Sequence, residues 1–190
     1  MLHSAPLAFI ALVLFQLVPS HGGAAPPSAP AAPAATSAAG IAWTVPKGWI
    51  SGPSSSAMRF ATYRVAAAPG DKEGGEISVF VFGKGDGGSV DGNVARWQAQ
   101  FQPEGKGAPL PPSPKATKEG PFSVTLVTAE GTFSSGMPGG DSVPKAGWAL
   151  RGAIVEGPGG QVFFKLVGPK KTVQKETLDF DRLVKSLRKG

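Results

Sequence analysis

The segment Glu76–Phe82, EISVFVF, constrains the fold of this chain more than any other stretch. Residues in a strand point alternately to the two faces of a sheet. Ile77 and Val79 therefore share one face, and Phe80 and Phe82 share the other. Because both faces are apolar, other layers must cover the strand on both sides, and it belongs inside a sheet rather than at an edge. We expect a layered fold with this strand at its centre.

Apolar residues that alternate with polar ones predict further strands along the chain. The predicted strands cover residues 42–45, 58–66, 76–82, 122–128, 148–156 and 161–167, and the fourth could continue to residue 133. The turn sequences PGDKEGG (69–75) and GPGG (157–160) each join two of these strands and predict antiparallel hairpins.

Two segments have the helical period, in which apolar residues recur along one side. In the first, Ser89 is a suitable N-cap, Pro103 ends the helix, and the apolar stripe consists of Val90, Val94, Trp97 and Phe101. The second covers residues 172–189, with an apolar face and a basic outer face. The predicted fold class is therefore α+β: a single, mainly antiparallel twisted sheet of about six strands between two helices, an α/β/α sandwich.

The first residues predict export. Residues 6–18 are almost wholly apolar, which is the length of a signal-peptide core and too short for a bilayer span. No Lys or Arg precedes them, and a buried strand or a misassigned start is the alternative. We predict a signal peptide over 1–24, an Ala/Pro-rich disordered linker over 25–40 and one domain over 41–190. The expected location is periplasmic or extracellular, without a transmembrane span.

The residue types present exclude several chemistries. The sequence contains no cysteine, and its two histidines, His3 and His21, lie in the predicted signal peptide. The mature domain would therefore lack disulfides, thiolate or imidazole metal sites and any His-dependent catalytic triad. We predict no catalytic residue, no cofactor and no metal site. A small hydrolase that uses two carboxyl groups stays open as an alternative, because its acids can lie far apart in the sequence.

The glycine-rich segment Gly83–Gly88, GKGDGG, matches the G-x-G-x-x-G pattern of dinucleotide-binding loops. That site needs a parallel βαβ unit, whereas the strands predicted here are joined by hairpins. Asp86 would also repel a pyrophosphate. A calcium site at Asp86, Asp91 and Asn93 lacks the ligand spacing of an EF-hand. We interpret the segment as a turn that leads into a helix.

Two groups of residues are candidate ligand or partner contacts. Asn93, Arg96 and Gln100 could form a polar row at the mouth of the glycine loop. The favoured alternative is structural: Asn93 and Gln100 satisfy backbone groups of that loop, and Arg96 is solvated or ion-paired. Four further polar residues lie on predicted strands, and only the register of the sheet decides whether they cluster: Arg59, Tyr63, Arg151 and Lys165.

The second group is the basic face of the last predicted helix, formed by Lys175, Arg182 and Lys185. The net charge is +6, and most of it lies from Lys165 onward. This face could dock on an anionic lipid or cell-wall polymer. The alternative is a solvated face with Lys175–Asp179 and Asp181–Lys185 pairs. The face lacks interleaved aromatic residues, which argues against nucleic acid as a partner.

Several motifs together resemble a functionally uncharacterised family of exported bacterial proteins. They are WTVPKGW at 43–49, MRFATYRV at 58–65, GG…NxxRWxxQF within 87–101, and FFKxxGP within 163–169. The resemblance spans nearly the whole predicted domain and supplies no catalytic residue. The arrangement of strands and helices also resembles the PsbP-like fold, which implies a binding or assembly module.

We therefore predict an exported, non-enzymatic binding or assembly module. Its partner would be an unidentified protein or an anionic component of the cell envelope. The small carboxylate-dependent hydrolase and a carrier of a small apolar ligand between sheet and helix are the alternatives.

Overall fold

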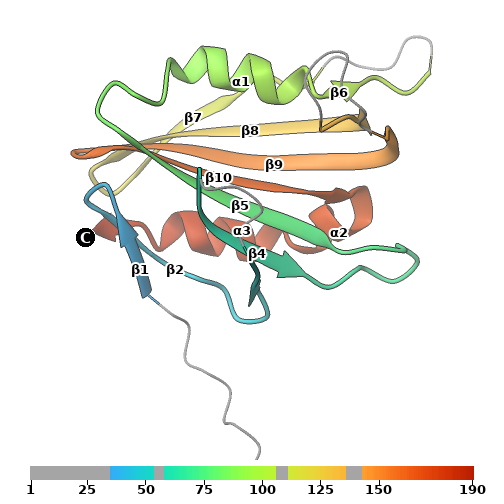
Figure 1. The fold of residues 1–190 in the computed structure, drawn as a ribbon, viewed down its shortest axis with the longest axis horizontal. Helices are drawn as coiled ribbons and strands as arrows, with labels where there is room; N and C mark the ends of the chain where they lie inside the picture. Colours follow the sequence, from blue (N-terminus) through green and yellow to red (C-terminus); the bar gives the residue numbers. More distant parts are fainter. Residues whose placement is uncertain (1–34, 54–57, 106–110, 136–142) are drawn as a thin grey trace, which may run out of the picture. The chain divides into compact units, whose positions relative to one another are not determined.

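The computed structural model describes residues 35–53, 58–105, 111–135 and 143–190 (Figure 1). The predicted signal peptide and residues 25–34 of the predicted linker lie outside this part of the chain. The described residues form a main sheet of eight strands, a second sheet of three strands and three helices. Among the described residues, all paired strands run antiparallel to each other.

The main sheet has the strand order β3-β4-β5-β10-β9-β8-β6, and β7 also pairs with β8. Its strands are β3 (Ile50–Ser51), β4 (Arg59–Val65), β5 (Gly75–Gly83), β6 (Phe101–Gln102), β7 (Lys115–Glu119), β8 (Phe122–Phe133), β9 (Lys145–Gly157) and β10 (Gly160–Pro169). Both predicted hairpins are confirmed, because β4 pairs with β5 and β9 pairs with β10.

The prediction of about six strands in a single sheet is wrong. The main sheet gains β3, β6 and β7, which are two to five residues long. The sequence of β7, KATKE, has no apolar alternation because it is a solvent-exposed edge strand, whose charges discourage further pairing.

A second, small sheet contains β1 (Ala35–Ala38), β2 (Ile41–Thr44) and β11 (Arg188–Lys189). Residues 35–38 of the predicted linker therefore belong to the folded unit as β1, and β2 is their partner. The turn between them has positive φ at both central residues, 52° at Ala39 and 74° at Gly40, as in a type I′ hairpin turn.

Helix α1 (Val90–Gln98) begins as predicted, and the Ser89 Oγ accepts a hydrogen bond from the Gly92 N–H at 3.1 Å. It ends before Phe101, which belongs to β6. The single helix predicted over 172–189 is wrong: the structure has α2 (Lys170–Lys175), α3 (Thr177–Lys185) and then β11. The break falls at Glu176, whose side chain is buried and accepts a hydrogen bond from the Trp49 Nε1 at 3.0 Å.

The helices lie on opposite faces of the main sheet, so the α/β/α arrangement is confirmed (Figure 1). Helix α1 covers one face, which we call the α1 face. Helices α2 and α3 and the small sheet cover the other, the α3 face. Strand β5 lies between β4 and β10, as expected for a segment that is apolar on both sides. Its Ile77 and Val79 are fully buried on the α3 face, whereas Phe80 and Phe82 are half-buried on the α1 face.

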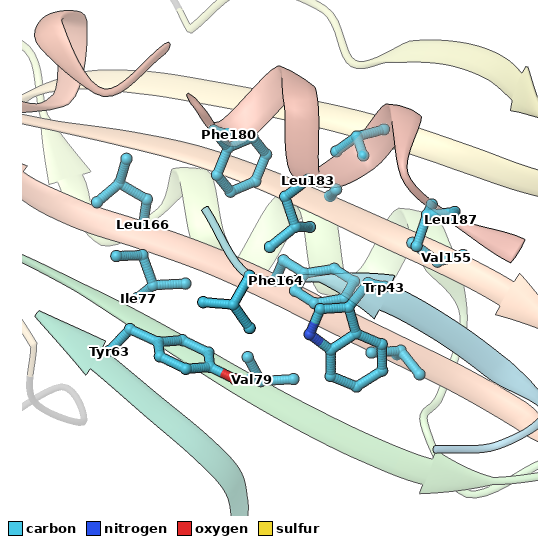
Figure 2. Packing of buried hydrophobic residues seen from close by; sticks show 14 of the residues in the cluster. Trp43, Tyr63, Ile77, Val79, Val155, Phe164, Leu166, Phe180, Leu183 and Leu187 are labelled. Atoms are coloured by element: carbon cyan, nitrogen blue, oxygen red, sulfur yellow. The ribbon is translucent and has the colours of Figure 1, made fainter. Parts of the chain in front are cut away.

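The larger core lies on the α3 face (Figure 2). Its fully buried members include Trp43, Ile77, Phe164, Leu166, Phe180 and Leu183. A smaller cluster lies under α1 and contains Val94, Trp97, Phe101, Val127, Ala129, Leu150, Ile154 and Phe163. Helix α1 has nine residues, so it covers only part of its face. The uncovered part of that face contains the candidate site.

Candidate functional site

Hydrogen bonds join the glycine loop to Asn93 of α1. Asn93 is buried, and its Nδ2 donates hydrogen bonds to the carbonyl oxygens of Gly87 at 2.7 Å and Ser89 at 2.9 Å. Arg96 is exposed and donates to the Asn93 Oδ1. These contacts are those of a structural cap for the loop. The antiparallel pairing of β5 with β10 also removes the parallel βαβ unit that a dinucleotide loop needs.

Gln100, just beyond α1, has a different role. It does not contact the glycine loop through its side chain; its Oε1 accepts a hydrogen bond from the Lys165 Nζ of β10. Its backbone carbonyl accepts one from the Ser134 N–H at 2.9 Å. Gln100 therefore connects the end of α1 to the centre of the sheet.

A groove of about 700 Å³ opens beside this contact, on the part of the α1 face that the helix leaves uncovered. Its charged lining residues are Arg59, Arg64, Glu73, Glu76, Lys145 and Lys165. Its apolar lining residues are Val65, Phe80, Phe133, Val143, Trp148 and Val167. The groove thus combines four cations with a wall of aromatic and aliphatic side chains.

Lys165 is the most perturbed titratable group of this groove. Burial lowers its pKa from 10.5 to about 8, and the nearby charges of Arg59 and Arg96 act in the same direction. The Nζ lies 5.7 Å from the ring centroid of Trp97 and 6.0 Å from that of Phe133. Among the described residues, no carboxylate forms an ion pair with Lys165, and its hydrogen-bond acceptor is the neutral Gln100.

The two carboxylates of the groove are both engaged elsewhere. Glu76 forms an ion pair with Arg59 and accepts a hydrogen bond from the Ser78 Oγ at 3.4 Å. Glu73 forms an ion pair with Lys145 at 2.7 Å. The Lys145 Nζ also lies 4.2 Å from the ring centroid of Trp148. The positive charge of Lys165 is therefore left without a negative partner from the groove itself.

The register now decides which strand residues cluster. Arg59 and Lys165 both line the groove on the α1 face. Tyr63 packs in the core on the α3 face, and Arg151 forms an ion pair with Asp181 of α3. Lys165 was named from the sequence among four strand residues that could cluster, with scattered surface charges as the default, and was not included among the candidate contacts. The available signal was a lysine within the apolar strand QVFFKLV, at a position that shares its face with Phe163 and Val167.

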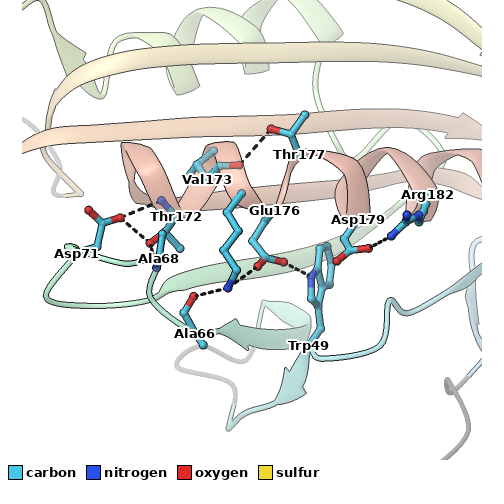
Figure 3. A network of polar contacts seen from close by, with 11 residues as sticks. Trp49, Ala66, Ala68, Asp71, Thr172, Val173, Glu176, Thr177, Asp179 and Arg182 are labelled. Atoms are coloured by element: carbon cyan, nitrogen blue, oxygen red, sulfur yellow. Dashed lines mark hydrogen bonds and ion pairs between the residues drawn. The ribbon is translucent and has the colours of Figure 1, made fainter.

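The basic residues of the last helices are not gathered into one free surface. Lys175 forms an ion pair with Glu176 at 3.5 Å and Arg182 one with Asp179 at 2.6 Å (Figure 3). The expected Lys175–Asp179 and Asp181–Lys185 pairs are replaced by these and by Arg151–Asp181. Lys185 is exposed beside a second hollow of about 390 Å³, which Arg151 and Asp181 also line.

A buried polar network anchors the start of α2 to the β4–β5 turn (Figure 3). Asp71 accepts hydrogen bonds from the Thr172 N–H at 2.9 Å and its Oγ1 at 2.7 Å. The Thr172 Oγ1 in turn accepts one from the Ala68 N–H at 2.9 Å. Helix α2 has no side-chain cap from its own N-cap residue, Pro169. Asp71 supplies a negative charge there, as a helix N-terminus prefers, so the role of the network is structural.

Within the described ranges, no group of three or more His, Cys, Asp or Glu side chains is placed to hold a metal ion. None of the helices in this part of the chain has the length and apolar character needed to cross a membrane. The sequence has no cysteine, so the chain has no disulfides.

No protein-family model and no curated protein sequence matches this chain. Among solved structures, it is similar to the solution structure of cyanobacterial PsbP (CyanoP) from Synechocystis sp. PCC 6803. The TM-score is 0.54, and the match covers 89% of this chain and 99% of CyanoP. The sequence identity is 13%, so the likeness concerns the fold alone. The chain therefore has a PsbP-like α+β fold with a mainly antiparallel sheet.

Proposed function

We propose that the protein is an exported, non-enzymatic binding module that holds a small organic ligand in the groove of the α1 face. One observation carries the proposal: aromatic and cationic side chains converge on a groove of about 700 Å³ where the sheet has no covering helix. Small-molecule sites usually have this size and combine an apolar lining with a few polar groups. Export rests on the predicted signal peptide.

The lining supports a ligand with both apolar and polar parts. The rings of Phe133 and Trp148 stack with centroids 5.5 Å apart and an interplanar angle of 3°. They offer a flat apolar wall beside Lys165 and Lys145. A carrier of a purely apolar ligand would instead need a cavity without these charges, so the amphipathic ligand is favoured.

No observation on the described residues favours the hydrolase alternative. Such an enzyme needs two carboxyl groups that face each other across a substrate. The groove holds Glu73 and Glu76, and each is engaged in an ion pair with a cation, Lys145 and Arg59. The arrangement is that of side chains that shape a binding surface.

The test is to titrate the full-length, isotopically labelled protein with 1-octanol, octanoate and octylammonium and to follow amide and indole NMR shifts. We expect at least one of these compounds to shift Trp148, Phe133 and Val167 more than residues on the α3 face. Val167→Phe should fill the groove and abolish the effect. The control is Val81→Phe, the same change on a half-buried valine of the α3 face. Shifts scattered evenly over both faces would contradict the proposal.

A further inference from the structure

We propose, building on the function above, that the ligand is an amphiphile with an oxyanion head group. The head group, a carboxylate or a phosphate, docks on the Lys165 ammonium at the floor of the groove. The apolar part lies along Phe133 and Trp148. The juxtaposition of an ammonium that lacks a counter-ion with a stacked aromatic wall points to this class of ligand.

The first argument is the charge balance around Lys165. The cations that act on its amine come from two elements: Arg59 from β4 and Arg96 from α1. Glu76 of β5 is one of the two carboxylates in the lining, and it forms an ion pair with Arg59. Burying an ammonium is costly unless a negative charge is near, because it loses water that only a counter-ion replaces. A bound oxyanion would supply that charge.

The second argument is the hydrogen-bonding capacity of the amine. An ammonium has three donors, and Gln100 accepts from one of them. Among the described residues, no further acceptor is within hydrogen-bond distance of the Lys165 Nζ. The remaining N–H groups suit an oxyanion, which forms the stronger, charge-assisted kind of hydrogen bond.

The third argument is the position of the apolar wall. The Phe133 ring centroid lies 6.0 Å from the Lys165 Nζ, and the Trp148 ring stacks on the Phe133 ring. A molecule whose head group contacts Lys165 can therefore extend along the two rings without leaving the groove. Among the other cations of the lining, Arg64 is exposed, Lys145 forms an ion pair with Glu73, and Arg59 forms one with Glu76.

The experiment compares four compounds with the same tail: octanoate, octyl phosphate, 1-octanol and octylammonium. Each is titrated into the full-length protein at pH 7, and Kd is taken from the NMR shifts of Trp148 and Val167. At least one of the two anions should bind about tenfold more tightly than 1-octanol, the usual effect of one charge-assisted hydrogen bond. Octylammonium should bind least. The tighter of the two anions assigns the head group.

Two variants test Lys165 directly. Lys165→Met shortens the side chain by only one atom and removes its charge, so the anions should lose their advantage while 1-octanol still binds. Gln100→Glu places a carboxylate against the ammonium as an internal counter-ion. It should abolish the preference for anions in a protein that keeps Lys165. The dispersion of the NMR spectrum shows for each variant that the fold is retained.

The pH dependence gives a third readout. Octanoate stays ionised between pH 7 and pH 9, whereas Lys165, with its pKa of about 8, loses most of its charge over this range. If binding requires the charged amine, the Kd for octanoate rises by up to about tenfold between these pH values. Arg59 and Arg96 keep their charge, and the Kd for 1-octanol should not change. The Lys165→Met protein should show no such pH dependence.

The outcomes separate this inference from the proposed function. If octanoate, octyl phosphate and 1-octanol all shift the groove residues with equal Kd, the inference is overturned and the binding function stands. If the anions bind more tightly but Lys165→Met keeps the full preference, the assignment to Lys165 is overturned. If no compound shifts the groove residues, the proposed function fails, and the inference fails with it.

Discussion

The two faces of one sheet differ in how completely they are closed. On the α3 face, Phe164 and Phe180 are fully buried, and the charge of Arg151 is paired with Asp181. On the α1 face, a helix of nine residues leaves a groove, and no carboxylate among the residues that the structure describes pairs with Lys165 there. The comparison shows that the larger core lies on the α3 face, whereas the α1 face has a smaller core and the groove that we propose as the ligand site.

The largest expected effect comes from removing one phenylalanine on each face. Phe164→Ala should lower the free energy of unfolding by about 3–5 kcal/mol, because the ring is fully buried against Trp43 and its loss leaves a cavity. Phe80→Ala removes a half-buried ring at the groove and should cost about 1 kcal/mol. Urea denaturation of both variants measures the difference. Equal losses would contradict the separation of the two faces.

The next effect concerns the polar contacts of the closed face. Glu176→Ala should cost about 2 kcal/mol, because the Trp49 Nε1 then loses its buried acceptor at 3.0 Å. The matched control is Asp179→Ala, which removes a more exposed carboxylate of α3 and should cost at most about 0.5 kcal/mol. Urea denaturation at pH 7 compares the two. Equal losses in the free energy of unfolding would show that burial of the carboxylate does not determine its contribution to stability.

A gain in stability is expected at the groove. Lys165→Met should raise the free energy of unfolding by about 1–2 kcal/mol at pH 7, less than the full pKa shift implies because the amine keeps some contact with water. The pKa of Lys165 is lowered to about 8 in the folded protein, against 10.5 for an unperturbed lysine. Between these values the unfolded chain binds more protons, so the stability of the unmodified protein rises with pH.

The advantage of Lys165→Met is therefore complete below about pH 8 and shrinks as the pH rises toward 10. Urea denaturation at pH 7 and pH 9.5 measures this change. A constant difference between the two proteins would mean that the lysine amine is not perturbed by burial.

The smallest effect is expected for the basic residues of α3. The double variant Arg182→Ser, Lys185→Ser should change the free energy of unfolding by at most about 0.5 kcal/mol, since both side chains are exposed. Octanoate should bind to it as to the unmodified protein. A large loss of octanoate binding would move the site from the α1 face to the α3 face.

The fold could be predicted to the extent that its signals were local. The alternation in Glu76–Phe82 required two covering layers, and the turn sequences fixed the hairpins. The short strands β3 and β6 could not be foreseen, because two-residue pairings depend on which segments meet in space. The break at Glu176 was also hidden, since the helical spacing of apolar residues continues through it from Val173 to Phe180.

The candidate site was predictable only in part. Gln100 was singled out from the sequence, and the structure places it against Lys165 in the groove. Asn93 and Arg96 were grouped with Gln100 by helical spacing. In the structure, Asn93 binds the glycine loop and Arg96 binds Asn93. Lys165 was missed as a site residue because its surroundings come from β4, β8 and α1. Those elements are brought together by a register that composition and periodicity do not encode.

The small sheet contacts the main sheet at one end of β10. The β1–β2 turn contacts the β9–β10 turn, where the Gly159 N–H donates to the Ala39 carbonyl at 3.1 Å. Lys165 lies five residues beyond Gly160, about 17 Å along β10 from that turn. Changes in the β1–β2 turn should therefore leave octanoate binding in the groove unaltered.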